Sequence, residues 1–352
     1  MRNTGVMLLV VCLLLTTIPL INAQENDENT TALPVTFQLS GLQHEYQGWN
    51  NCGPATLTTA LSFFGWTDDQ YTAAHWLKPD PEDKNVSAEQ MAAFVNTFTD
   101  VKALVRYGGD LTLLRQLVAH EFPVIIAAGY EPDGYDWMGH YLLVTGYDDD
   151  TDMILTQDSF LGPDTSYPQT EIDYFWRHFN RIFIVLYPPE REEELFNLLG
   201  EDADAQINAT RALETARQEA IANSIDPFAW FNMGTSYTLL GKYEEATIAF
   251  EQARNVGEGL PWRMLWYQFG PFEAYYQTGR TAELIDLVQF NLATTANGIH
   301  PIEETYYYAG LARAALGEQE RAIVNLQQAI TINPNFAPAV EALADIAGTD
   351  GT

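Results

Sequence analysis

A repeated pattern in the C-terminal half of the chain constrains the fold more than any other feature of the sequence. Gly241, Gly279 and Gly317 follow one another at intervals of 38 residues, and each lies in the expected turn between two helical stretches. A period of about 20–50 residues is typical of stacked supersecondary units, which bury a continuous core only together. We therefore expect residues 226–347 to form an all-α array of helix pairs with a glycine in each turn.

Two copies of this pattern share most of their diagnostic positions. The first runs through Trp230, Met233, Gly234, Tyr237, Ala246 and Phe250, and the second through Tyr306, Ala309, Gly310, Ala322, Leu326 and Pro334. These copies resemble the tetratricopeptide repeat (TPR), and the resemblance implies a helical-repeat domain that binds a protein or peptide partner. The copy between them matches the repeat pattern less closely. Pro271 within it is expected to kink the first helix of its pair, because proline removes a helix hydrogen bond.

Helical patterns also flank the repeats. Residues 336–346 are expected to form a closing helix, and residues 189–225 a helical linker with a half-repeat at residues 211–221. Terminal units of this kind cover the apolar ends of a repeat array.

The preceding region, residues 33–188, mixes helix and strand patterns. Helices are expected at residues 54–64, from Ser87 and from Asp110, and strands at residues 123–128, 140–147, 153–157 and 181–187. Helices followed by strands predict an α+β domain rather than a doubly wound sheet.

The first residues have the pattern of an export signal. Arg2 precedes an apolar run at residues 6–15, and Ala23 is followed by a short acidic linker at residues 24–32. The run is shorter than the ~20 residues that a membrane span needs, so residues 1–23 are interpreted as a signal peptide cleaved after Ala23. We expect a secreted or extracytoplasmic protein without an integral membrane domain after cleavage. An uncleaved N-terminal anchor is the alternative.

The charge of the chain excludes several functions. Asp and Glu number 48 against 17 Lys and Arg, which gives a formal net charge of -31. Such a body repels phosphate backbones and anionic headgroups, so no nucleic acid is expected among the partners. Because 47% of the residues are hydrophobic, packed cores are expected instead of acidic disorder. A substrate segment is expected to be neutral or cationic.

One cysteine remains after signal cleavage. Cys12 lies inside the predicted signal peptide, which leaves Cys52 without an intramolecular disulfide partner. Cys52 stands directly before a predicted helix whose first turn contains Pro54. The N–H groups and the dipole at a helix N-terminus favour the thiolate, which is the reactive form of cysteine.

Three further side chains complete a site for nucleophilic catalysis. Gln47 precedes Cys52 by five residues and is expected to place its amide N–H beside the Cys52 backbone N–H as an oxyanion hole. His140 opens a predicted strand, and Asp158 ends the next one. On an antiparallel hairpin these two positions lie at the same edge, so the carboxylate is expected to orient the imidazole.

Together these segments resemble the peptidase C39-like family, a branch of the papain-like cysteine peptidases. The matching segments are Gln47 with Cys52-Gly-Pro-Ala, Gly139-His-Tyr, Thr145-Gly-Tyr and Gln157-Asp-Ser, within residues 33–188. The resemblance implies an α+β papain-like cysteine peptidase domain, with Cys52 as nucleophile, His140 as general base, Asp158 as orienting residue and Gln47 as oxyanion donor. No cofactor or metal is expected. Members of the family often sit on ATP-binding-cassette transporters and cut leader peptides. The sequence shows neither a P-loop nor a transmembrane bundle, so that role is not carried over.

Other interpretations of these residues stay open. A lone cysteine is often a small buried hydrophobe, and His44 is the strongest rival to His140 because it lies close to Gln47. The favoured function is an exported cysteine peptidase whose repeats bind a polypeptide substrate or protein partner. The main alternative is a non-catalytic C39-like and TPR scaffold or peptide-binding protein. A third is an amidase or transferase acting on cell-wall peptides or other amides.

Overall fold

The structure, a computed structural model, describes residues 33–295 and 299–348. The signal peptide expected at residues 1–23 and the linker expected at residues 24–32 lie outside this part of the chain. From Pro34 onward the chain packs as one unit. The domain boundaries expected at residues 188 and 225 therefore stay predictions. None of the described helices has the length and apolar character that a bilayer span requires.

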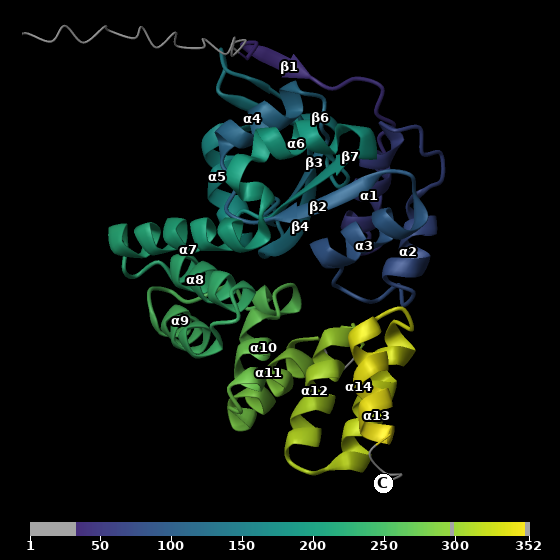
Figure 1. The fold of residues 1–352 in the computed structure, drawn as a ribbon, viewed down its shortest axis with the longest axis vertical. Helices are drawn as coiled ribbons and strands as arrows, with labels where there is room; N and C mark the ends of the chain where they lie inside the picture. Colours follow the sequence, from purple (N-terminus) through teal and green to yellow (C-terminus); the bar gives the residue numbers. More distant parts are fainter. Residues whose placement is uncertain (1–32, 296–298, 349–352) are drawn as a thin grey trace, which may run out of the picture. The chain divides into compact units, whose positions relative to one another are not determined.

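An antiparallel sheet forms the centre of the region up to Tyr187 (Figure 1). Its strands in the described residues are β1 (Thr36–Gln38), β2 (Lys102–Arg106), β3 (Val124–Tyr130), β4 (Met138–Asp148), β5 (Met153–Asp158), β6 (Gly162–Pro168) and β7 (Phe183–Tyr187). They follow the order β2-β7-β3-β4-β5-β6, and β1 pairs with β4. Every pair is antiparallel. The predicted α+β class is confirmed, although the sequence patterns did not predict β1, β2 and β6.

Helices surround this sheet, and local sequence explains where several of them begin. They are α1 (Cys52–Ser62), α2 (Gln70–Leu77), α3 (Ala88–Phe98), α4 (Leu111–Ala119), α5 (Gln169–Trp176) and α6 (Glu192–Leu199), with 3₁₀ turns η1 (Arg177–Phe179), η2 (Pro189–Arg191) and η3 (Gly200–Ala203). Ser87 and Gln90 form the expected capping box, and the Asp110 side chain accepts from the Leu113 N–H at the start of α4.

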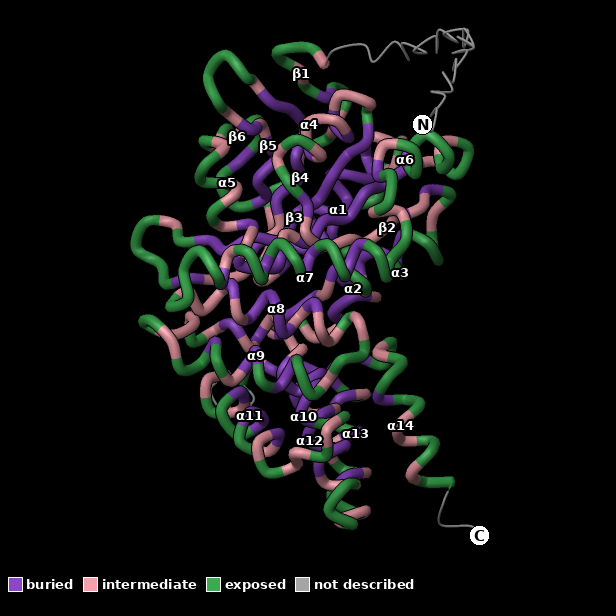
Figure 2. Tube along the Cα trace, turned by 60° about the vertical axis from the view of Figure 1, so that its left-hand side comes forward, coloured by how far each residue is buried: buried purple, intermediate pink, exposed green. Residues whose placement is uncertain are grey.

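The two faces of the sheet contribute to different hydrophobic cores. Val124 and Ile126 pack with apolar residues of α4, α5 and α6, whereas Ile125, between them, packs with residues of α1, α2 and α3. This alternation follows from the period of two residues in a strand. Figure 2 shows the central strands as mostly buried segments, while exposed turns recur along α7. The core that contains Ile125 also contains Phe231 and Phe250 of the repeat region.

The C-terminal region is all-helical where the structure describes it. Its elements are α7 (Ala205–Ala222), α8 (Pro227–Leu239), α9 (Tyr243–Asn255), η4 (Met264–Trp266), α10 (Gly270–Gln277), α11 (Thr281–Thr294), α12 (Glu303–Ala315), α13 (Gln319–Ile332) and α14 (Ala337–Gly348). Gly241, Gly279 and Gly317 have φ values of 69°, 69° and 74° in the turns α8–α9, α10–α11 and α12–α13. Left-handed backbone of this kind favours glycine.

The effect expected of Pro271 is wrong. Proline was expected to kink a helix, but α10 begins at Gly270 and Pro271 lies in its first turn. No intrahelical hydrogen bond is lost there, because the first N–H groups of a helix have no partner in any case. The middle repeat instead has a short first helix, preceded by the separate turn η4.

Carboxyl side chains are buried where α12 meets residues 78–87 of the N-terminal region. Asp83 and Glu303 are 0% exposed and Glu304 is 7% exposed. Asn85 Nδ2 donates to Glu304 Oε1 at 2.7 Å, and Asn333 Nδ2 donates to Glu303 Oε1 at 2.9 Å. Burial raises the pKa of Asp83, and the charge and hydrogen bond of Glu303 raise it further. A hydrogen bond between two carboxyl groups requires a proton on one of them, so low pH favours this contact.

We expect Asp83→Asn to reduce the loss of stability at alkaline pH. A raised folded-state pKa gives stability that is complete below the unfolded value of about 3.9 and is lost as pH rises through the folded value. The asparagine amide supplies the missing proton at every pH, so the melting temperature at pH 8 should rise by about 2 °C. Thermal unfolding at pH 5 and pH 8 measures this, with exposed Asp68→Asn as the control. Equal pH dependence in the wild type and Asp83→Asn would contradict it.

Candidate active site

Cys52 is the first residue of α1. Asn51 gives this helix no side-chain cap, and Pro54 has no N–H, so the positive end of the helix is left facing the thiol. Thr56 Oγ1 in the next turn donates to the carbonyl oxygen of Tyr141 at 3.2 Å, which fixes α1 against β4 beside His140. The Cys52 side chain is half-buried.

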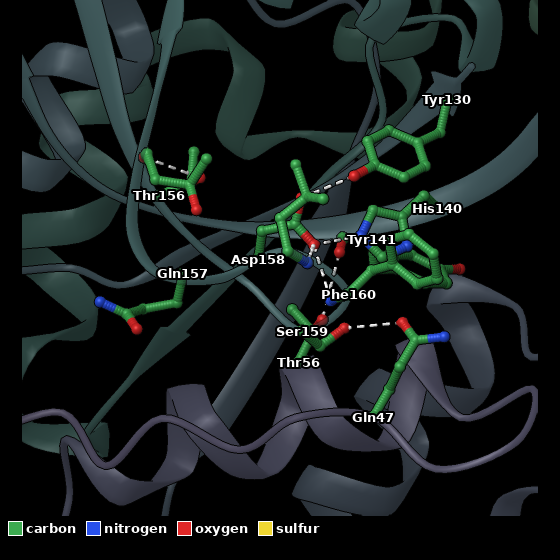
Figure 3. Close-up of polar contacts among 12 residues, drawn as sticks. Gln47, Thr56, Tyr130, His140, Tyr141, Thr156, Gln157, Asp158, Ser159 and Phe160 are labelled. Carbon is green, nitrogen blue, oxygen red and sulfur yellow. Dashed lines mark hydrogen bonds and ion pairs between the residues drawn. The ribbon is translucent and has the colours of Figure 1, made fainter. Parts of the chain in front are cut away.

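The β4–β5 hairpin brings His140 and Asp158 together. Asp148 pairs with Met153 and Leu143 with Gln157, so the start of β4 and the end of β5 lie at one edge of the sheet. His140 Nε2 lies 2.9 Å from Asp158 Oδ1 (Figure 3). This bond leaves Nδ1 of the imidazole available to the thiol.

Asp158 is held by several donors besides His140. Its Oδ2 accepts from the hydroxyl group of Tyr130 at 3.1 Å (Figure 3) and from that of Tyr167 at 2.5 Å. Its Oδ1 also accepts from the backbone N–H groups of Phe160 at 2.8 Å and Leu161 at 3.2 Å. Burial opposes ionisation, but the hydrogen bond and charge of His140 and the other donors hold the pKa of Asp158 well below its usual range. The side chain is therefore a carboxylate.

The electrostatics of the site favour a thiolate–imidazolium pair. Burial raises the pKa of the Cys52 thiol, but the hydrogen bond and charge of His140, the Tyr141 N–H and the charge of Lys78 outweigh it, so the pKa lies below its ordinary value. Burial lowers the pKa of His140, while its hydrogen bonds to Asp158 and Cys52 raise the pKa to about 9. Such a thiolate is able to attack an electrophilic carbon near neutral pH.

Gln47 is tied to the residue that follows Asp158. The Gln47 N–H donates to the Ser159 carbonyl oxygen at 2.8 Å, and Ser159 Oγ donates to Gln47 Oε1 at 3.0 Å. Figure 3 shows the amide nitrogen of Gln47 on the side away from Ser159. This nitrogen makes no hydrogen bond with any described residue, which leaves it free to donate to a ligand.

Gln70 organises the loop that carries Gln47. Gln70 is 2% exposed, and its Oε1 accepts from the Gly48 N–H at 2.6 Å and Asn51 Nδ2 at 3.0 Å. Its Nε2 donates to Glu45 Oε1 at 2.9 Å and to the Tyr46 carbonyl oxygen at 2.8 Å. A saturated buried amide of this kind holds a loop in one conformation.

Sequence reasoning assigned no role to Gln70, Ser159, Tyr130 or Tyr167. Ser159 directly follows Asp158, so its position was a usable signal. Tyr130 and Tyr167 reach Asp158 only through the pairing of β3 and β6 with their neighbours. Tyr130 also stacks on His140, with ring centroids 4.5 Å apart.

Two other histidines have separate roles. His44, the rival to His140, pairs through Nδ1 with Gln157 Oε1 at 2.9 Å. His178 accepts a hydrogen bond from Trp137 Nε1 at 3.1 Å and stacks on Phe228 of α8, with centroids 3.7 Å apart. Burial and the charge of Arg177 lower the pKa of His178 to about 3, so this imidazole is neutral and structural.

A cavity of about 480 Å³ opens beside the reactive pair. Cys52, His140 and Tyr141 line it together with residues 267–269 and residues of α8, α10 and α12. This volume lies within the ~300–1,000 Å³ of typical ligand sites. Across the described ranges, no cluster of three or more His, Cys, Asp or Glu side chains is arranged to hold a metal ion.

Family models match both parts of the chain. Residues 30–183 match the Peptidase_C39 like family, and residues 229–253 and 304–335 match models of the tetratricopeptide repeat. The chain therefore carries a C39-like peptidase domain followed by tetratricopeptide repeats, in the predicted order. The comparison with curated proteins finds no match.

Solved structures similar to the chain cover less than half of it. They include a protein described as a C39-like peptidase from Bacillus anthracis, with 16% identity, a TM-score of 0.36, and coverage of 43% of this chain and 96% of the other. A double glycine motif protease from an AMS/PCAT transporter, solved with the leader peptide, has 16% identity, a TM-score of 0.33 and coverage of 43% and 94%. The peptidase domain of Streptococcus ComA, a bi-functional ABC transporter, has 15% identity, a TM-score of 0.35 and coverage of 42% and 99%.

Asp158→Asn should lower the pKa of His140 from about 9, because it removes the carboxylate charge that stabilises the imidazolium. NMR titration of the histidine ring measures this directly. Asp164→Asn is the matched control, since Asp164 is exposed and accepts from Gln38 and Gln157 rather than from His140. A His140 pKa that is the same in the wild type and Asp158→Asn would show that the carboxylate does not stabilise the imidazolium.

Proposed function

We propose that the protein is a cysteine peptidase that hydrolyses peptide bonds through Cys52, His140 and Asp158. The observation that carries this proposal is the buried His140–Asp158 hydrogen bond of 2.9 Å, with His140 and Cys52 lining the same cavity. The C39-like domain and the cavity beside Cys52 support the same assignment.

Each proposed residue has a defined chemical task. The Cys52 thiolate attacks the carbonyl carbon of the scissile bond, and the oxyanion is stabilised by the Cys52 N–H and the Gln47 amide. His140 gives its proton to the leaving amine, which departs and leaves a thioester. His140 then takes a proton from water as the water attacks the thioester, and the acid product and free Cys52 are released. Asp158 keeps the imidazole oriented throughout.

The substrate is proposed to be a polypeptide outside the cytoplasm. Export rests on the signal-like residues 1–23, and polypeptide binding rests on the repeats, a fold that presents extended surfaces to protein partners. The same chemistry suits other amides, including cell-wall peptides. The assay therefore includes labelled peptidoglycan beside a protein-derived peptide library.

Cys52→Ala should abolish cleavage of the peptide library, because no other described cysteine can replace the nucleophile. Mass spectrometry of the products from wild type and Cys52→Ala measures this and identifies the scissile bonds. Asp158→Asn should lower kcat/KM by roughly 10²–10⁴. Equal products from wild type and Cys52→Ala would contradict the proposal. A partner captured equally well by both proteins, with no hydrolysis, would favour the scaffold.

The rate of hydrolysis should depend on pH differently from the rate of thiol alkylation. The ion pair exists above the lowered pKa of Cys52 and below the pKa of His140, about 9. As pH rises through about 9, His140 loses the proton that the leaving amine needs, so hydrolysis falls. The thiolate persists, so iodoacetamide labelling stays at its plateau. Stopped assays from pH 5 to pH 10 follow both rates. Parallel decline of the two above pH 9 would contradict this assignment of the proton.

A further inference from the structure

The repeat region lines the cavity that contains Cys52. Its residues there include Tyr267, Phe269, Glu273, Glu304 and Tyr308, and they share this cavity with His140 and Tyr141. The family comparison assigns the N-terminal and C-terminal regions separately, with the C39-like match ending at residue 183. The cavity is therefore larger than what the C39-like domain builds alone.

The residues of the repeat region that line the cavity form one of its walls. One contact that holds this wall in place lies directly beside His140. A Cβ atom on Gly139 would lie 3.0 Å from Cγ of Tyr267 and 2.8 Å from Cζ of Phe179, so glycine allows the tyrosine ring to rest on β4. Gln268 Nε2 donates to the His178 carbonyl oxygen at 3.0 Å. The segment before α10 is thereby held against the sheet side of the cleft.

A second group of contacts, all hydrogen bonds, lies on the helical side of the cleft. Asn333 Nδ2 donates to the Leu77 carbonyl oxygen at 2.9 Å, and Asn335 Nδ2 donates to the Trp76 carbonyl oxygen at 3.0 Å. Asn85 donates to Glu304 on the same side. Since α1 begins with Cys52 on the helical side and β4 carries His140 on the sheet side, the repeats connect both halves of the site.

Two carboxyl groups flank a tyrosine on this wall. Tyr308 Oη donates to Glu273 Oε2 at 3.1 Å, and Glu304 precedes Tyr308 by one helical turn in α12. Glu304 is 7% exposed and lines the cavity, yet its Oε2 has no hydrogen-bond partner among the described residues. Burial and the charge of Glu303 raise the pKa of Glu304 well above its ordinary value, which favours the protonated carboxyl in the absence of a ligand. A cationic ligand at this oxygen would favour the carboxylate and supply the missing partner.

The surrounding surface has the character of a cation site. Aromatic rings of Tyr267, Phe269 and Tyr308 line the same cavity as these carboxyl groups, and rings of this kind attract ammonium and guanidinium groups. Lys84 also lines the cavity, but its Nζ donates to Asn50 Oδ1 at 2.9 Å and lies 4.7 Å from the centroid of the Trp49 ring.

We propose that Glu273 and Glu304 of the repeat region form a subsite of the substrate cleft that binds a Lys or Arg side chain of the polypeptide substrate. This inference rests on the proposed peptidase function, and it assigns to the repeats a direct part in substrate choice. The basic side chain reaches Glu304 Oε2 and the free lone pairs of Glu273 from the cavity, with the tyrosine rings at its sides.

Charged thiol reagents test the subsite without requiring hydrolysis. Cationic trimethylammonium-ethyl and anionic sulfonato-ethyl methanethiosulfonate both form a disulfide with Cys52 and release methanesulfinate. The ratio of their rates, cation to anion, reports the local potential. Glu273→Gln and Glu304→Gln keep the acceptor oxygens for Tyr308 and Asn85, so both should fold. Glu273→Gln should lower the ratio about threefold or more at low ionic strength. Glu304→Gln should lower it only at a pH where Glu304 is ionised, because burial and the charge of Glu303 raise the pKa of Glu304.

Glu320→Gln is the matched control. Glu320 is an exposed acid on α13 and does not line the cavity, so its ratio should equal that of the wild type. The same variants are then compared on the peptide library, where Glu273→Gln and Glu304→Gln should reduce cleavage next to Lys and Arg. An unchanged rate ratio in both variants would overturn the subsite, and so would a Cys52 that reacts with neither reagent in any variant. Absence of hydrolysis by the wild type together with a shifted ratio would overturn only the peptidase.

Discussion

A carboxylate cut off from water is stable only when hydrogen bonds replace its hydration, and Asp158 is 0% exposed. Three of its hydrogen-bond partners are side chains on other strands: Tyr130 on β3, His140 on β4 and Tyr167 on β6. Two more are backbone N–H groups in the turn after β5. The register of each strand pair must therefore be right for the charge to be tolerated. The orientation of His140, and through it the state of the Cys52 thiol, depends on this one buried group.

The site residues that could be predicted from the sequence are those next to a recognisable helix or strand pattern. Cys52 was found because it directly precedes a helix, and His140 and Asp158 because each stands at the end of a strand-like run. The structure brings His140 and Asp158 within hydrogen-bond distance, although Cys52 is the first residue of α1 and His140 is the third residue of β4. Tyr130 and Tyr167 were missed because cross-strand pairing, which no local pattern records, carries them to Asp158. The kink expected at Pro271 is wrong for a related reason: the effect of a proline depends on where its helix starts, and α10 starts at Gly270.

Periodicity in the repeats predicted the helix pairs and their turns, but it did not predict what the array packs against. Glu303, Glu304 and Asn333 occupy positions that an isolated repeat would leave to solvent or to the next unit. Here they are buried against residues 76–90 of the C39-like domain. Polar residues that depart from the apolar periodicity of a helix are thus a signal of contact between regions, although they do not identify the partner segment.

Because the repeats form part of the cleft, the residues that line it are synthesised at different times. Cys52 and His140 leave the ribosome early, whereas Tyr267, Glu304 and Asn335 follow much later, and N-terminal regions fold first as a chain emerges. Until Tyr267 and Glu304 emerge, the part of the cavity wall that they form beside Cys52 is absent. A polypeptide cut short before α12 would retain every proposed reactive group but would have an open, differently charged pocket. Completion of the cleft is in this way coupled to completion of the chain.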